Sequence, residues 1–318
     1  MTASPAPFTI REPTPDDLPA IVAIINTEEA KPYTPEAFAQ RTQEIRQQCG
    51  FFQEWVIEND RDRITGTVRL HSPPLPTQEF GFQLVVAPNA RERGYGSALL
   101  ARVLDSARAQ GAERLETEVR ETNPASRAWA ERRGFSLHFH RFESALDLTT
   151  FDEAAHTDLQ GRLASADITW QDMDVLGRDE ANWTRLYTFF AERDYDSPDM
   201  QGEPRLTVEQ ARHMLRKNPT VQPGGIVLAT RGEDWLGMSV MARHPRGAYN
   251  YFTGVVPEAR GMGVARALKV EVIRRARAAG FTGMFTNNLS VNAPMLAVNR
   301  RLGFEPRPGL WVMRRRLS

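Results

Sequence analysis

Hydrophobic and polar positions along the chain predict short strands and longer helices in two successive halves. In the first half, apolar runs predict strands over 8–11, 55–57, 64–70 and 81–86, a helix face over 18–25, and a helix over 97–110 that stops at Gly111. In the second half, the same order predicts strands over 226–229, 236–241 and 249–256, then a helix over 266–279. Strands that lead into helices in each half predict an α/β or α+β fold with a mixed sheet.

The two halves also repeat each other in sequence. Residues 88–135 align with residues 257–304 at a constant offset of 169, and 17 of the 48 positions are identical without a gap. Unrelated segments of average composition would share roughly 3. A period this long indicates duplication of a whole domain rather than a solenoid of small units.

Composition narrows the class of protein further. The chain has 318 residues with 40 Lys plus Arg, 40 Asp plus Glu and one cysteine, Cys49. Two domains are therefore expected, without a disulfide framework and without a basic field for nucleic acid. No signal peptide or membrane-spanning run is evident, so we expect a soluble cytoplasmic protein with no membrane partner and no metal site.

A small-residue turn lies between a strand and a helix in each half. Its sequences are Arg91-Glu92-Arg93-Gly94-Tyr95-Gly96 and Arg260-Gly261-Met262-Gly263-Val264-Ala265. Small residues let backbone N–H groups approach a ligand, and the following helix presents its positive N-terminal end, which suits a pyrophosphate. Neither turn has the Gly-Lys-Ser/Thr ending of a Walker loop or the third small residue of a dinucleotide fingerprint.

The turns instead resemble the Arg-x-x-Gly-x-Gly/Ala motif of the GNAT-type N-acetyltransferases. Asn123 and Asn292, and the Gly-Phe pairs at 134–135 and 303–304, follow at that family's spacing. The resemblance covers nearly the whole chain. It implies two tandem GNAT domains at 1–150 and 167–318 with a linker at 151–166, arranged as a pseudo-dimer in one chain that can be monomeric.

The resemblance also implies acetyl-CoA as cofactor, bound between two splayed parallel strands. The pantetheine arm would lie along Leu84, Val85 and Val86, and along Thr253, Gly254 and Val255. The pyrophosphate would bind the turns and helix starts, at Arg91, Glu92, Arg93, Gly94, Tyr95, Gly96, Ser97 and Asn123, and at Arg260, Gly261, Met262, Gly263, Val264, Ala265, Arg266 and Asn292. Lys269 is expected to be a further cation available to phosphate. The other interpretation of these residues is ordinary: tight turns, helix caps and surface charges.

Catalytic groups are less complete in the sequence. Glu118 falls where ribosomal-protein N-terminal acetyltransferases, which the first half resembles at 115–120, carry a base, and their tyrosine acid falls at Ala130. The second half has Asn287 and Asn299 at these two positions. We take Glu118 and Asn299 as the catalytic candidates.

The resemblance implies transfer of an acetyl group to the primary amine of a small molecule or peptide. Acidic and aromatic residues at 187–199 can hold a cationic amine or form a solvated loop. Because both halves lack part of the catalytic pattern, a non-catalytic acyl-CoA-binding protein is the alternative.

Overall fold

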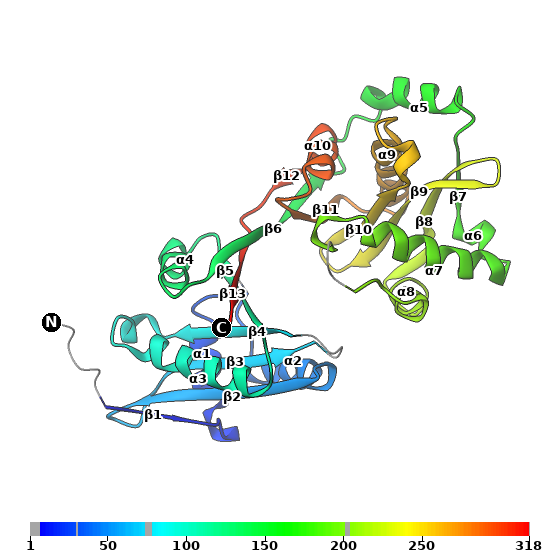
Figure 1. The fold of residues 1–318 in the computed structure, drawn as a ribbon. Coiled ribbons are helices and arrows are strands. Elements are labelled where there is room, and N and C mark those ends of the chain that lie inside the picture. The colour runs from blue at the N-terminus through cyan, green and yellow to red at the C-terminus, as the bar shows by residue number, and fades with distance from the viewer. Residues whose placement is uncertain (1–6, 30, 74–77, 201–203, 318) are drawn as a thin grey trace. The chain divides into compact units, whose positions relative to one another are not determined.

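The computed structural model describes residues 7–29, 31–73, 78–200 and 204–317. Contacts divide these residues into two compact units (Figure 1). Unit 1 contains residues up to His138 together with Leu310–Ser318, and unit 2 contains Phe139–Gly309. The predicted mixed sheet flanked by helices is confirmed in each unit.

Unit 1 has a sheet with the strand order β1-β2-β3-β4-β5-β13, in which the β4–β5 pair is parallel and the other pairs are antiparallel. Its strands are β1 (Phe8–Arg11), β2 (Phe51–Asn59), β3 (Ile64–Ser72), β4 (Glu79–Val86), β5 (Arg114–Arg120) and β13 (Leu310–Arg316). Its helices are α1 (Leu18–Ile25), α2 (Pro35–Gln48), α3 (Tyr95–Ala109) and α4 (Pro124–Glu131).

The side chains of β4 alternate between two cores, which explains how helices cover both faces of this sheet. Val85 packs with the buried residues of α1, whereas Phe80 and Phe82 pack with Leu99 of α3. Trp55 and Leu115 are fully buried in the α3 core. The predicted helix over 97–110 therefore corresponds to α3.

Unit 2 has the strand order β7-β8-β9-β10-β11-β6, with β10 and β11 parallel and β12 paired to β6. Its strands are β6 (Ser136–Asp147), β7 (Thr169–Asp172), β8 (Val221–Arg231), β9 (Asp234–His244), β10 (Gly247–Val255), β11 (Gly283–Leu289) and β12 (Glu305–Pro306). The first three residues of β6 belong to unit 1, because unit 2 begins at Phe139. Its helices are α5 (Thr157–Ala164), α6 (Met173–Leu176), α7 (Glu180–Tyr195), α8 (Val208–Leu215), α9 (Val264–Ala278) and α10 (Ala293–Arg301).

Each repeat contributes its last long strand to the sheet formed by the other repeat. Strand β13 pairs with β5 from Leu310↔Arg120 to Arg316↔Arg114, and Figure 1 shows this red C-terminal strand beside β5. Strand β6 pairs with β11 from Gly283↔Asp147 to Leu289↔Arg141. Relative to the predicted range 1–150, unit 1 has β13 in place of most of β6; relative to the predicted range 167–318, unit 2 lacks β13 and also includes residues 139–166.

The segment 151–166, expected as a linker, contains helix α5. Leu159 and Leu163 of this helix are buried in the core of unit 2. Within the described ranges, no helix combines the length and the apolar character needed to cross a bilayer.

Candidate active site

The parallel strands β4 and β5 separate part-way along their length in unit 1. Their ladder runs from Glu79↔Arg114 to Phe82↔Thr117, although β4 continues to Val86 and β5 to Arg120. The ends of the two strands are therefore not paired with each other, and we call the region between these ends the wedge.

Backbone groups of β4 in this wedge point away from β3. Ala87 donates its N–H to the Thr65 carbonyl, so in an antiparallel ladder the alternate residues Val85 and Gln83 also bond to β3. The N–H and C=O groups of Leu84 and Val86 then face the side that β5 has left. Such groups can pair with an extended amide-containing ligand as a further strand would.

Strands β10 and β11 form the same wedge in unit 2. Their ladder contains Ala248↔Met284 and Tyr249↔Phe285, whereas β10 extends to Val255. Val256 donates to Leu236, so Thr253 and Val255 face the wedge, at the positions that correspond to Leu84 and Val86. A register shift between Asn250 and Phe252, which unit 1 lacks at β4, helps to turn β10 away from β11.

The glycine turns have matching backbone geometry in the two units. Gly94 and Gly263 have φ angles of 89° and 93° and directly precede α3 and α9. Two residues earlier, Glu92 and Gly261 also have positive φ, at 65° and 79°. The N–H groups of the first two residues of each helix have no carbonyl one turn earlier in the helix, so they are available to an anion, whereas Ser97 of α3 donates its N–H to the Gly94 carbonyl at 3.0 Å.

The φ at Gly261 leads to a stability prediction. Gly261→Ala is expected to lower the free energy of unfolding by about 1 kcal/mol, because alanine is strained at positive φ. No heavy atom lies within 4 Å of a Cβ added there, so a clash does not contribute. Urea unfolding measures the change.

Gly161→Ala is the matched control for that variant. Gly161 lies in α5, and the space around its added Cβ is equally open. This substitution is expected to stabilise the protein by roughly 0.5–1 kcal/mol. Equal effects at the two sites would contradict the backbone explanation.

The first arginine of each turn is held by an acidic residue of its own unit. Arg91 donates to the Val86 carbonyl (3.1 Å) and to Glu28 (2.5 Å). Arg260 donates to the Val255 carbonyl (3.4 Å) and to Asp196 (2.8 Å). Each arginine therefore links the end of its strand to an acidic residue earlier in the chain. Its role in binding a phosphate stays a prediction.

Asn123 and Asn292 cap helices, which is the ordinary interpretation of these residues. The Asn123 Oδ1 accepts from the Ser126 N–H of α4, and the Asn292 Oδ1 accepts from the Met295 N–H of α10. Asn123 also donates to Glu28 (3.1 Å), so Glu28 links Arg91 to the start of α4. A direct contact with a cofactor stays a prediction.

The structure overturns the expectation for Lys269. Its side chain is 2% exposed, inside α9, where Nζ donates to the Asn250 Oδ1 (2.5 Å) and lies 5.2 Å from the Phe304 ring centroid. Burial lowers the pKa of Lys269 to about 7. The residue faces inward on the helix and is not available to bind a phosphate at the surface.

The two catalytic candidates have different surroundings. Glu118 lies on β5 beyond the last residue that pairs with β4, opposite Val312 of β13, and is exposed. Asn299 is 2% exposed on α10, and its Nδ2 donates to the Asn288 Oδ1 (2.6 Å). The Asn299 Oδ1 has no hydrogen-bond partner in the described structure, so it can accept from a bound donor.

Titratable groups that the sequence did not single out gather beside the wedge of unit 1. Glu79 of β4 and Glu116 of β5 share a hydrogen bond and both contact Arg314 of β13. Burial raises the pKa of Glu116 to about 7, and the hydrogen bond that its protonated form donates to Glu79 and the negative charge of Glu79 add to the rise. The alternation of Glu116 and Glu118 on one strand face was the signal available in the sequence.

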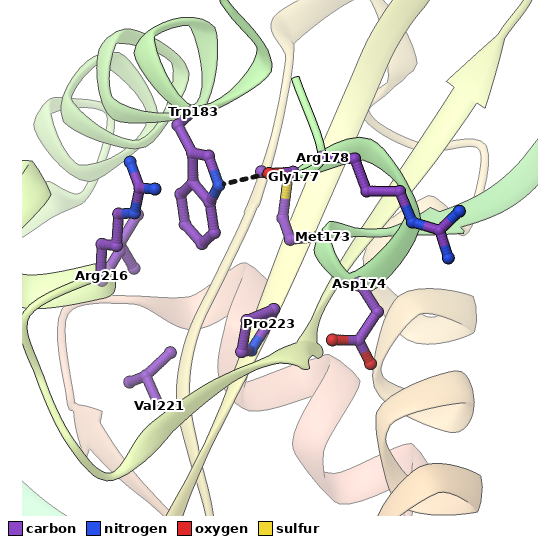
Figure 2. A pocket seen from close by; sticks show the side chains of 9 residues that line it. Met173, Asp174, Gly177, Arg178, Trp183, Arg216, Val221 and Pro223 are labelled. Carbon is purple, nitrogen blue, oxygen red and sulfur yellow. Dashed lines mark hydrogen bonds between the residues drawn. The ribbon is translucent and has the colours of Figure 1, made fainter. Parts of the chain in front are cut away.

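A cavity in unit 2 is built from other residues. It has a volume of about 340 Å³, and its walls come from α6, α7, α8 and the start of β8. Figure 2 shows Trp183 donating to the Gly177 carbonyl on one side, at 3.0 Å, and Arg178 and Asp174 on the other. No residue predicted to bind the cofactor lines this cavity.

Comparison with known proteins decides the family. A model described as the acetyltransferase (GNAT) family matches residues 18–135, and one described as an acetyltransferase (GNAT) domain matches residues 162–285. The chain belongs to the GNAT family of N-acetyltransferases. The two matches make it a tandem GNAT protein, as the sequence motifs predicted.

Individual relatives agree with this assignment. The mycothiol acetyltransferase of Cellulomonas flavigena is 29% identical over 233 residues, covering 70% of this tandem GNAT chain and 63% of that protein, less than two thirds of its length. A GCN5-related N-acetyltransferase from Sphaerobacter thermophilus has a TM-score of 0.68 at 19% identity, covering 98% and 97% of the two chains. A tandem GNAT protein from the clavulanic acid biosynthesis pathway has a TM-score of 0.61 at 20% identity, covering 98% and 99%. At these identities the structures show the fold alone.

Proposed function

We propose that this tandem GNAT protein transfers the acetyl group of acetyl-CoA to a primary amine of a small molecule or peptide by direct attack. One observation carries the proposal: in both units an open strand wedge leads into a glycine turn and a helix N-terminus. A molecule that combines amide groups with a pyrophosphate matches the backbone groups of the wedge and the turn. The mycothiol acetyltransferases among the relatives support a small-molecule acceptor.

Different residues of the chain would bind the pantetheine arm and the pyrophosphate of acetyl-CoA. Leu84 and Val86, or Thr253 and Val255, would pair through their backbone with the amides of the pantetheine arm. The N–H groups that start α3 and α9 would bind the pyrophosphate. Acetyl-CoA would supply the thioester carbonyl that the amine attacks, and a strand N–H directed at its oxygen stabilises the developing charge by about 3 kcal/mol.

Calorimetry and a thiol assay test this function. Titration with acetyl-CoA is expected to give saturable heat at one or two sites, and a panel of primary amines to give release of free CoA thiol. Gly94→Trp and Gly263→Trp are expected to remove binding in unit 1 and unit 2 respectively, because a bulky side chain fills the turn. No heat at millimolar acetyl-CoA would refute the proposal.

Two glycines serve as controls for these tryptophan variants. Gly111 and Gly280 follow α3 and α9 with φ of 75° and 84°, and no heavy atom lies within 4 Å of a Cβ added at either. Tryptophan there imposes comparable backbone strain at the opposite end of the helix, without the 2.6 Å contact with the Leu159 Cδ1 that a Cβ at Gly263 would make. These variants are expected to bind acetyl-CoA as the unchanged protein does.

An acyl-CoA-binding protein without catalysis is the second candidate. The observation that favours it is the pair Ala130 and Asn299, neither of which is an acid, at the position of the family's tyrosine. Thiol release that depends on an amine and is abolished by Gly94→Trp or Gly263→Trp would exclude this candidate.

A further inference from the structure

A row of three residues crosses the sheet of unit 1 just before the wedge opens. His71 of β3 pairs with Gly81 of β4, and Gly81 pairs with Glu116 of β5. The next pair, Phe82↔Thr117, is the last of the parallel ladder. The row therefore lies at the closed end of the wedge.

The glycine in the middle of this row makes room for the histidine. A Cβ added to Gly81 would lie 2.6 Å from the His71 Cε1, so the imidazole occupies the space above β4. The Cα atoms of His71 and Glu116 are two strand spacings apart, roughly 10 Å. Because directly paired residues present their side chains to one face, the imidazole lies over Gly81 on the face of the sheet that also carries Glu116.

The arginines near this row are unequally shared between the two carboxylates. Arg114 and Arg314 contact Glu79 at 2.8 and 2.7 Å, whereas the contact of Arg314 with Glu116 is longer, at 3.2 Å. The Glu116 side chain retains 28% of its surface exposed. The negative charge of Glu79 is thus compensated by two arginines. Glu116 keeps access to solvent and the capacity to accept a proton.

The pKa shifts of Glu116 and His71 agree with these different roles of the two carboxylates. Burial, together with Glu79, raises the pKa of Glu116 to about 7. Burial also lowers the pKa of His71, and the positive charge of Arg69 lowers it further, so its imidazole is neutral at pH 7. The charged groups that shift the pKa of His71 or Glu116 are Arg69 on β3, Glu79 on β4 and Arg314 on β13, and Arg114 on β5 acts on Glu79.

We propose that Glu116 is the group that removes the proton from the amine acceptor in unit 1, and that His71, whose imidazole lies over Gly81, holds this amine. The inference rests on the proposed acetyl transfer. The Glu116 carboxylate takes one proton from the acceptor's ammonium, and the amine lone pair then forms the C–N bond. As the C–S bond breaks, the sulfur receives the bonding electrons and the second proton from nitrogen, leaving an amide and a free thiol.

This assignment differs from the sequence prediction of Glu118. Both glutamates face the same side of β5, but Glu116 is the one in register with Gly81 and His71. The proposed site also includes Arg314, so the exchanged strand β13 contributes to the site of unit 1.

The experiment follows thiol release against pH with the amine that gives the highest turnover among glucosamine, spermidine, tyramine and a short peptide. For the unchanged protein, kcat is expected to rise with pH and level off near pH 7, as the carboxylate forms. Glu116→Gln is expected to lower kcat by about 100-fold or more and to remove this limb, while the heat of acetyl-CoA binding is kept. Glu116→Asp is expected to recover part of kcat with the limb displaced, which a purely structural role would not produce.

His71→Asn is expected to raise KM for the amine more than it lowers kcat. Glu113→Gln, an exposed glutamate just before β5, is the matched control and should leave both constants unchanged. If Glu116→Gln keeps kcat and its pH limb within twofold in a protein that turns over, the inference is wrong and the transfer belongs elsewhere. Absence of acetyl-CoA binding in the unchanged protein would instead overturn the proposed function.

Discussion

A chain that ends at Gly309 is expected to lose the folded sheet of unit 1, although it still contains all of residues 1–138. Without β13, strand β5 keeps only its four-residue parallel ladder with β4. Val312 and Met313 are fully buried, and each such side chain contributes about 1.5–3 kcal/mol when buried. Together with the lost β5–β13 ladder, the loss is on the order of 5 kcal/mol, which is comparable to the whole stability of many domains.

Hydrogen exchange resolved along the chain measures this loss. In the truncated chain, amides of β3, β4 and α3 are expected to exchange as in an unfolded segment. Adding a peptide of residues 310–317 should restore part of their protection. Met313→Ala in the full chain is a milder test of the same packing and is expected to lower the free energy of unfolding by about 2–5 kcal/mol. Met313→Leu should lower it by less than about 1.5 kcal/mol. Full protection after truncation would show that unit 1 does not depend on the exchanged strand.

Lys269→Met is expected to change how stability depends on pH. In the folded chain the pKa of Lys269 is lowered to about 7 by burial, against an ordinary value of 10.5. Between these values the unfolded chain binds a proton that the folded chain does not, so the free energy of unfolding rises with pH. Below pH 7 both forms are protonated, and the full penalty of burying the charge is present.

Denaturant unfolding from pH 6 to pH 10.5 measures this dependence as a difference between the unchanged protein and the variant. The variant is expected to be the more stable at pH 7, and its advantage to fall by up to about 1.4 kcal/mol per pH unit above that. The total change is of the order of 4 kcal/mol. Leu100→Met, at the corresponding buried position of α3, is the control and should show no such slope. A difference that is constant with pH would contradict a neutral buried amine.

Local pattern was enough to predict the elements that surround the turns. Alternation along β4 and the apolar face of α3 depend on neighbours within a few residues, so the sequence shows them directly. The positive φ at Gly94 and Gly263 follows from the same local rule, because glycine tolerates that geometry. The sequence analysis does not predict helix α5, because its eight residues lie in the segment interpreted as the linker between the two domains.

Side-chain partners could not be predicted in this way. Arg91 and Arg260 carry the same sequence pattern as phosphate ligands, yet Glu28 and Asp196, 63 and 64 residues earlier in the chain, hold them. Lys269 was misplaced because its position in the helix does not show which residues pack against it. The tertiary neighbour Asn250 supplies the hydrogen bond that lets a lysine be buried.

The duplication, the two glycine turns and the family to which they belong can be identified without coordinates, because each depends on residues close together in the chain. Which strand completes which sheet depends on the folded chain, since a strand's alternation specifies its faces but not the partner along its edge. The folded chain also decides that His71, Gly81 and Glu116 form one row, because the register of three strands sets that juxtaposition. The wedges themselves arise where hydrogen bonding between neighbouring strands stops, a property of pairs of strands that neither strand's sequence contains alone.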